Sequence, residues 1–209
     1  MGPTPSLWCA AVALLSVRAG ADNLLPNPGF EAGSGAEGLA EQWQDNSGWA
    51  DLDVRYTLDT DTPHSGRACQ RVTCSRLAYG AVQLIPASGV PLTQGRIYRV
   101  RGWLRGDVGN VALQLRLAPS PYTVYVERAL PVEADWRSLD YLWSSTVDDP
   151  DARFMLRFAQ SGTLWVDDLS VEEITEDEAR RLGPPLRPGN LLRNGRFDLD
   201  LANWLLNHG

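Results

Sequence analysis

The chain lacks lysine and has only two histidines, His64 and His208, among its 209 residues. Two histidines are too few for a three-histidine metal site, and they leave a Ser-His-Asp triad little choice of base. No glycine-rich phosphate-binding loop is present either. These absences argue against metal-dependent hydrolases, serine hydrolases and nucleotide-dependent enzymes, and we predict that the chain itself is not an enzyme.

The basic residues are all arginine: 19 of them stand against 26 acidic residues, for a formal net charge of −7. This balance argues against a nucleic-acid partner, which needs a clustered basic surface. The exclusive use of arginine has two explanations, a GC-rich genome or a need for planar guanidinium groups that recognise hydroxyls. The sequence leaves both open.

Cysteine is scarce as well, with 3 residues in the whole chain. Cys9 lies in an apolar N-terminal stretch, whereas Cys69 and Cys74 lie in one predicted strand. In an extended strand the Cα atoms of the latter two are about 16 Å apart, and a disulfide needs less than about 7 Å. We therefore expect no disulfide, with the two thiols on opposite faces of the strand.

One apolar run stands out, residues 7–17, and the small residues Ala19, Gly20 and Ala21 follow it. This pattern is typical of a secretory signal peptide over residues 1–21 with cleavage before Asp22; a buried N-terminal helix is the alternative. The run is too short for an ordinary membrane span. We expect a secreted or extracellular mature chain, with the periplasm and the cell surface as further options, and no membrane span.

The motif NLLPNPGFE at residues 23–31 returns as NLLRNGRFD at residues 190–198, with Asn, Leu, Leu, Asn and Phe in register. Such a recurrence marks the start of a repeated domain. We predict one domain over residues 22–173, a linker over residues 174–189 and the start of a second, truncated repeat over residues 190–209. The chain is then expected to be a monomer tethered to further domains.

Short runs of alternating apolar and polar residues fill the region between Trp49 and Glu172. Such alternation predicts strands, and no stretch keeps a helical period for three turns. About nine or ten strands at this spacing predict an all-β fold, an antiparallel β-sandwich or barrel. We expect turns between them, one of them at the DDPD segment, residues 148–151. The predicted strands span residues 51–58, 68–75, 81–86, 97–105, 111–118, 123–130, 137–145, 153–159 and 163–171.

The alternation also assigns side chains to faces. In residues 97–105, Tyr98, Val100 and Leu104 share the side that we predict to face the core. The same rule points Met155 outward. The outward positions are rich in arginine, glutamine and aromatic side chains. From alternation alone, the candidate ligand-binding side chains are Gln83, Gln114, Arg116, Tyr125 and Arg157.

Adjacent acids occur at three places, and two of them suggest no site. Asp148 and Asp149 belong to the predicted DDPD turn, and Glu172 and Glu173 lead into the linker. Neither pair resembles the two carboxylates across a cleft that glycoside hydrolysis needs.

Asp167 and Asp168 differ because they interrupt the apolar run LWVDDLSV, where adjacent carboxylates need cations or hydrogen-bond donors to offset desolvation. A calcium ion would supply that charge, since it takes roughly six to eight oxygen ligands. Glu31 and Asp61 are available partners from the start and middle of the domain. The alternative is a pair of solvated acids on an edge strand.

Several motifs occur in order: the opening NLLPNPGFE, Trp43 about a dozen residues later, then HSGRA, YGAVQ, GRIYRVRGWLRG, a turn at Trp136 and the closing LWVDDLSV. In this order they resemble the secreted carbohydrate-binding modules of families four, nine and twenty-two, which have a galactose-binding-like jelly-roll. The resemblance covers residues 22–173. It implies a two-sheet sandwich, a structural calcium ion near the N terminus and a glycan-binding groove on one sheet.

The resemblance also implies roles for single residues. Tyr79 would be the aromatic residue on which a sugar ring stacks, in a loop where related modules often have tryptophan. The implied calcium ligands are Glu31, Asp61, Asp167, Asp168 and the backbone carbonyls of Gly29 and His64.

Together these observations predict a non-catalytic carbohydrate-binding module that targets an appended glycoside hydrolase, or another polysaccharide-active enzyme, to a polysaccharide or oligosaccharide. Sugar C–H faces suit aromatic rings, and equatorial hydroxyls suit planar donors and acceptors such as arginine and glutamine. The alternative is a structural or protein-binding spacer of a secreted or cell-surface protein, because a fold does not determine a function.

Overall fold

The computed structural model describes residues 22–182 of the chain. Its long strand β6, Ile97–Gly106, follows the alternation of the sequence strictly. Buried and partly exposed side chains alternate along its whole length. Tyr98, Val100 and Leu104 are buried in the core. The inward face predicted for this strand is therefore confirmed.

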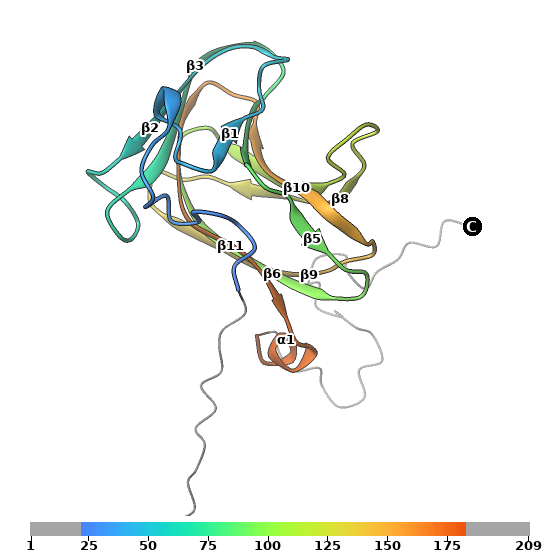
Figure 1. The fold of residues 1–209 in the computed structure, drawn as a ribbon. Coiled ribbons are helices and arrows are strands. Elements are labelled where there is room, and N and C mark those ends of the chain that lie inside the picture. Colours follow the sequence, from blue (N-terminus) through green and yellow to red (C-terminus); the bar gives the residue numbers. More distant parts are fainter. Residues whose placement is uncertain (1–21, 183–209) are drawn as a thin grey trace, which may run out of the picture.

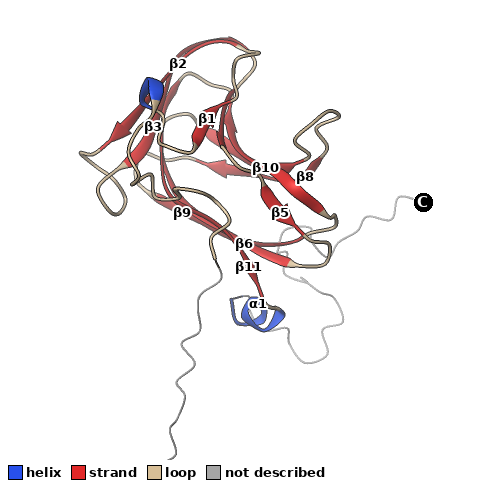
Figure 2. Cartoon of the chain, in the orientation of Figure 1, coloured by secondary structure: helices blue, strands red, loops and turns tan. Residues whose placement is uncertain are grey.

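The described residues form eleven strands in two antiparallel sheets, with little helix (Figures 1 and 2). Besides β6 these are β1 (Trp43–Asp45), β2 (Asp51–Asp59), β3 (Cys69–Tyr79), β4 (Val82–Pro86), β5 (Val90–Leu92), β7 (Asn110–Arg116), β8 (Val124–Pro131), β9 (Arg137–Ser144), β10 (Asp149–Phe158) and β11 (Gly162–Ile174), together with the short helices η1 (Ala36–Gly38) and α1 (Glu176–Leu182). The first sheet, here the β10 sheet, has the order β1-β4-β10-β7-β8, and β5 pairs with β10 at its side. The second, the β6 sheet, has the order β2-β3-β11-β6-β9. This arrangement confirms the predicted all-β antiparallel sandwich of jelly-roll type.

All nine predicted strands are present, although several of their ends are shifted. The two strands that the sequence did not indicate, β1 and β5, have only three residues each. A run of three residues is too short to show an alternation, and both strands depend on pairing with β4 or β10.

The DDPD segment was predicted as a turn, and this is wrong for its last three residues, because β10 begins at Asp149. A bulge between Asp149 and Ala152 accommodates Pro150, which cannot donate a ladder hydrogen bond and is tolerated at a strand start or bulge. Asp149 is buried and accepts hydrogen bonds from the Tyr125 hydroxyl, at 2.9 Å, and from the Asp151 N–H, at 2.9 Å.

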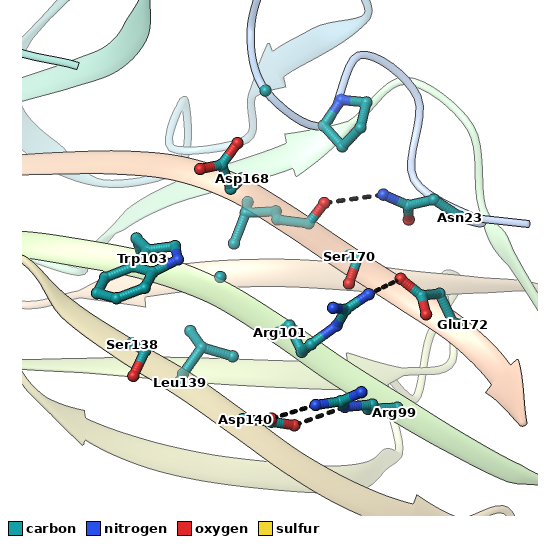
Figure 3. A pocket seen from close by; sticks show the side chains of 14 residues that line it. Asn23, Arg99, Arg101, Trp103, Ser138, Leu139, Asp140, Asp168, Ser170 and Glu172 are labelled. Carbon is teal, nitrogen blue, oxygen red and sulfur yellow. Dashed lines mark hydrogen bonds and ion pairs between the residues drawn. The ribbon is translucent and has the colours of Figure 1, made fainter. Parts of the chain in front are cut away.

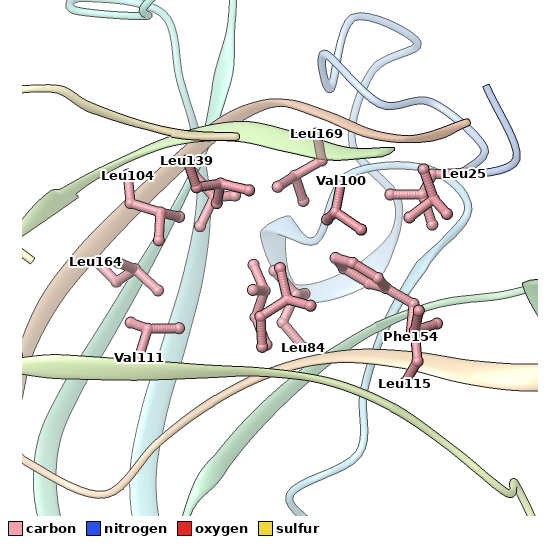
Figure 4. Close-up of a cluster of buried hydrophobic side chains, with 14 of the residues drawn as sticks. Leu25, Leu84, Val100, Leu104, Val111, Leu115, Leu139, Phe154, Leu164 and Leu169 are labelled. Atoms are coloured by element: carbon pink, nitrogen blue, oxygen red, sulfur yellow. The ribbon is translucent and has the colours of Figure 1, made fainter. Parts of the chain in front are cut away.

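One hydrophobic core lies between the sheets (Figure 4). Val100, Leu104 and Leu169 of the β6 sheet point toward the side chains of the β10 sheet, among them Leu115 and Phe154. The N-terminal segment closes one end of the core, where the fully buried Phe30 lies 5.2 Å from Trp43 between ring centroids. Packing of this kind holds both sheets rigid, so their outer faces present side chains at defined positions.

Both cysteines of the described residues are free and buried, as expected for thiols too far apart to bridge. Cys74 belongs to the core cluster, whereas Cys69 lies on the other side of β3, near Asp167 and Asp59. Burial, and next the nearby Asp167 carboxylate, raise the pKa of Cys69 to about 12, so this thiol stays protonated at neutral pH.

The helix α1 follows directly on the last strand and begins the predicted linker. Thr175 caps it: the Glu178 N–H donates to Thr175 Oγ1 at 3.2 Å, and Glu178 Oε2 accepts from the Thr175 N–H at 2.9 Å. The helix has seven residues and lies within the segment that was predicted as a linker. The predicted signal peptide, the rest of the linker and the second repeat lie outside the described residues. No helix within residues 22–182 is long and apolar enough to cross a membrane.

Candidate functional site

The outer face of the β10 sheet, turned away from the core, brings together four of the side chains that alternation singled out. Arg157 of β10 lies opposite Gln83 of β4. Two residues earlier on β10, Met155 lies opposite Gln114 of β7. Two residues earlier again, Arg153 lies opposite Arg116. From Arg157 to Arg153 the face extends about 13 Å, at roughly 3.3 Å per residue.

Hydrogen bonds hold the two glutamines of this face in place. Gln83 Oε1 accepts a hydrogen bond from Asn46 Nδ2 at 2.5 Å, and Gln114 Nε2 donates to the Glu127 carboxylate. Gln83, Gln114 and Met155 are buried although they lie on the outer face. Alternation gave their direction correctly but could not show this burial.

An aromatic ring lies at each end of this face. At the Arg116 end, the guanidinium carbon lies 4.7 Å from the ring centroid of Tyr122, which comes from the β7–β8 turn and is 51% exposed. At the Gln83 end, the loop of residues 46–50 donates through Asn46 to Gln83 and carries the half-exposed Trp49. Neither Tyr122 nor Trp49 was singled out from the sequence, because a loop aromatic carries no period that reveals its exposure.

Tyr79 lies at the end of β3 and thus in the β6 sheet, where it pairs with Asp51. It is 67% exposed and meets Trp49 edge to face, with 5.9 Å between ring centroids and an angle of 87°. Gly80 permits this approach, since a Cβ there would lie 2.4 Å from the Ala50 Cβ. Tyr79 is therefore not on the outer face itself but forms an exposed aromatic pair with Trp49, next to the Gln83 end.

Tyr125 does not join the open part of the face. Its ring packs against the core cluster, and its hydroxyl donates to Asp149. Burial, followed by the hydrogen bond to the Asp149 carboxylate, raises the pKa of Tyr125. The hydroxyl already has its partner, and alternation could not reveal this because Asp149 had been assigned to a turn.

The acids of the predicted calcium site surround the loop of residues 62–68. Asp167 is fully buried and accepts backbone N–H groups of His64, Ser65 and Asp168 at 2.9, 3.2 and 2.8 Å. Burial raises the pKa of Asp167 to about 6. Asp168 accepts one hydrogen bond from the Ser65 hydroxyl and contacts His64 Nδ1 at 2.7 Å.

Glu31 is held in the same way by the other side of that loop. Glu31 Oε1 accepts the N–H groups of Arg67 and Ala68 at 2.7 and 3.1 Å, and the first of these bonds is the main reason that its pKa is lowered. Gly66 has a φ of +63°, and a Cβ there would lie 2.2 Å from Glu31 Oε1. A glycine is therefore required where this carboxylate reaches the loop, and the HSGRA motif supplies it.

The remaining predicted calcium ligands are Gly29 and Asp61. Gly29 lies beside Asp168, with 3.6 Å from its would-be Cβ to Asp168 Oδ1, but Asp61 is exposed and its N–H donates to Asp59. Within residues 22–182, no three His, Cys, Asp or Glu side chains are grouped so that they could hold a metal ion. Among the described residues, backbone N–H donors offset the buried charge of Asp167. The alternative, a pair of solvated acids on an edge strand, is wrong, because β11, which carries Asp167 and Asp168, lies between β3 and β6.

A polar cavity of about 500 Å³ opens on the outer face of the β6 sheet, beneath the N-terminal segment (Figure 3). Ion pairs cross its floor: Arg99 with Asp140, at 2.5 Å, and Arg101 with Glu172. Asn23 joins its rim by donating to the Leu169 carbonyl at 2.9 Å. The sequence did not indicate this cavity, and both of its arginines are already paired with acids.

Comparison with solved structures shows which proteins share this fold. The sequence itself matches no protein-family model and no curated protein. A CBM4 carbohydrate-binding module is 14% identical, with a TM-score of 0.54 over 72% of this chain and 99% of the module. The CBM22-1 xylan-binding domain from Paenibacillus barcinonensis is 12% identical, with a TM-score of 0.51 over 75% of this chain and 97% of the domain.

The enzymatically active domain of a bacteriophage CBA120 tailspike protein is also similar, at 11% identity and a TM-score of 0.53, over 73% of this chain but only 21% of that one. At such identities the likeness shows the fold alone. The chain thus has the jelly-roll sandwich of carbohydrate-binding modules, as the sequence resemblance implied.

Proposed function

We propose that the domain is a non-catalytic module that binds a polysaccharide on the outer face of the β10 sheet. The observation that carries this proposal is the row of planar polar side chains on three adjacent strands, with an exposed aromatic at either end. The fold shared with carbohydrate-binding modules supports it.

The chemistry of the face suits a sugar chain. Guanidinium groups offer planar donors to hydroxyls, and a pyranose C–H face packs on an aromatic ring. Tyr122 lies at the Arg116 end, and the Trp49–Tyr79 pair at the Gln83 end. A polysaccharide that spans both ends would contact rings and hydrogen-bonding groups together.

Isothermal titration of the chain with xylan, mixed-linkage glucan, mannan and pectic oligosaccharides tests this function. On an open face, binding is offset by side-chain ordering and desolvation, so we expect dissociation constants of about 10 µM to 1 mM. Absence of binding to every one of these glycans would favour the spacer function instead.

Tyr79→Ala should weaken glycan binding at least about tenfold, or roughly 1.4 kcal/mol, because it removes an exposed ring of the aromatic pair. The melting temperature should not change, since the side chain is 67% exposed. Leu182→Ala is the control: this side chain is also exposed but lies on α1. Equal affinities of Tyr79→Ala and the unchanged chain would exclude Tyr79 from the site.

We further propose that the module has no hydrolytic activity and serves to keep an appended polysaccharide-active enzyme near its substrate outside the cell. Glycoside hydrolysis needs two carboxylates across a cleft, whereas Glu127, the acid opposite Gln114 on the outer face of the β10 sheet, is bound to that amide. Release of reducing sugar by the purified chain would overturn this part of the proposal.

Calcium binding is a separate proposal that rests on the sequence resemblance. If the ion binds the folded state, a concentration of a hundred to a thousand times its dissociation constant contributes roughly 3 to 4 kcal/mol. A chelator should then lower the melting temperature by about 10 °C for a domain of this size. An unchanged melting temperature, together with no calcium in elemental analysis, would show that this domain does not bind the ion.

A further inference from the structure

We infer that the polysaccharide is acidic, and that its carboxylates bind three arginines on the outer face of the β10 sheet: Arg116, Arg153 and Arg157. This inference rests on the proposed function and names the chemical class of its ligand.

The three arginines lie close together on two adjacent strands. Arg116 of β7 and Arg153 of β10 are directly opposite each other in the ladder. Arg157 lies four residues further along β10, on the same face, with only Met155 between them on that side. Like charges placed opposite each other across a sheet destabilise it, so their presence here calls for an anion that offsets them.

Within residues 22–182, none of the three arginines forms an ion pair with an acid. By contrast, Arg99 and Arg101 on the β6 sheet each pair with a carboxylate. The difference is marked because the chain as a whole carries a net charge of −7, so acids are plentiful. The outer face of the β10 sheet thus concentrates unpaired positive charge on a negative protein.

Arg116 is the most constrained of the three. Its Nε is buried and has no hydrogen-bond partner within the described residues, while its guanidinium carbon lies over the Tyr122 ring. Burial, and then repulsion from Arg153 and Arg157, lower its pKa. An anion bound between these groups would relieve the repulsion and supply the missing acceptor.

Two acids, Glu127 and Asp151, lie on the neighbouring strand or on β10 itself, and among the described residues neither forms an ion pair with the three arginines. Glu127 of β8 accepts a hydrogen bond from Gln114. Asp151 is exposed and lies two residues before Arg153 on β10. The two side chains line a small cavity of about 70 Å³ but form no ion pair with each other. A guanidinium group matches a carboxylate with two parallel hydrogen bonds, a geometry that a neutral hydroxyl does not offer.

The test is isothermal titration of the chain with polygalacturonate oligomers and with the same oligomers after methyl esterification, which removes the charge and keeps the backbone. We expect the acidic form to bind at least tenfold more tightly, and its affinity to fall as salt is raised. Arg116→Gln and Arg153→Gln should each reduce the affinity for the acidic form at least tenfold. Arg55→Gln, an exposed position on β2, makes the same charge change and should have no effect.

The outcomes separate the two proposals. Equal binding of both forms would overturn the acidic ligand while leaving polysaccharide binding intact, and no binding of any glycan would remove the proposed function itself. Dextran sulfate is a further probe. If Arg116→Gln and Arg55→Gln weaken binding to dextran sulfate equally, and the chain shows no preference for polygalacturonate, the arginines form only a general anion-attracting surface. That result would overturn the inference.

Discussion

Val100→Asp is expected to prevent folding of the domain at room temperature. Val100 is fully buried in the middle of β6 and faces Phe154 and its neighbours in the opposite sheet. An uncompensated carboxylate there costs several kcal/mol, a large part of the roughly 5 to 15 kcal/mol that stabilise a typical domain. Circular dichroism and urea denaturation measure the effect.

Ser138→Asp is the matched control for that substitution. It adds the same charge on the neighbouring strand β9, but Ser138 is exposed on the outer face of the same sheet. The free energy of unfolding should change by less than about 0.5 kcal/mol. A similar loss of stability in both variants would show that the faces of the β6 sheet are assigned incorrectly.

Phe154→Ala should lower the free energy of unfolding by about 3 to 5 kcal/mol, since it removes a fully buried ring and leaves a cavity. The ring also packs edge to face against Trp43, with 6.4 Å between centroids. Because β1 has only three residues, loosening Trp43 should release this edge of the β10 sheet as well.

Val124→Ala provides the comparison within the β10 sheet. Its side chain is 45% exposed on β8, so its loss should cost little. Urea titrations of both variants measure the difference. If Phe154→Ala were as stable as Val124→Ala, the β10 sheet would not be packed on the core through Phe154.

The position of the proposed site follows from the sandwich itself. The inward side chains of β10 pack in the core and hold the strand in place, so the outward Arg153 and Arg157 project from a rigid support. Arg116 is held on the neighbouring strand by the ladder with β10. Sites on strands of this kind keep their geometry better than sites on loops.

Several features of this protein could be predicted from period-two patterns. The alternation in residues 97–105 predicted which side chains of β6 are buried, and the same rule directed Gln83, Gln114, Arg116 and Arg157 to the face turned away from the core. These predictions succeed because successive strand residues point to opposite faces whatever the neighbouring strands are.

Other features depended on contacts between distant parts of the chain. Tyr79 had been linked by resemblance to the binding groove, but β3 pairs with β2 and β11 and so belongs to the other sheet. The Asp167 carboxylate is satisfied by the loop of His64 and Ser65, about a hundred residues away in sequence. No local pattern indicates such partners.

The sequence by itself determined the fold class and the two faces of each strand, because both follow from local alternation and turn residues. Only the tertiary structure decided which strands are neighbours, and therefore that Arg116, Arg153 and Arg157 form one unpaired group. The physical reason is that alternation assigns a side chain to one of two faces, whereas its lateral neighbours are set by long-range hydrogen-bond registers between strands.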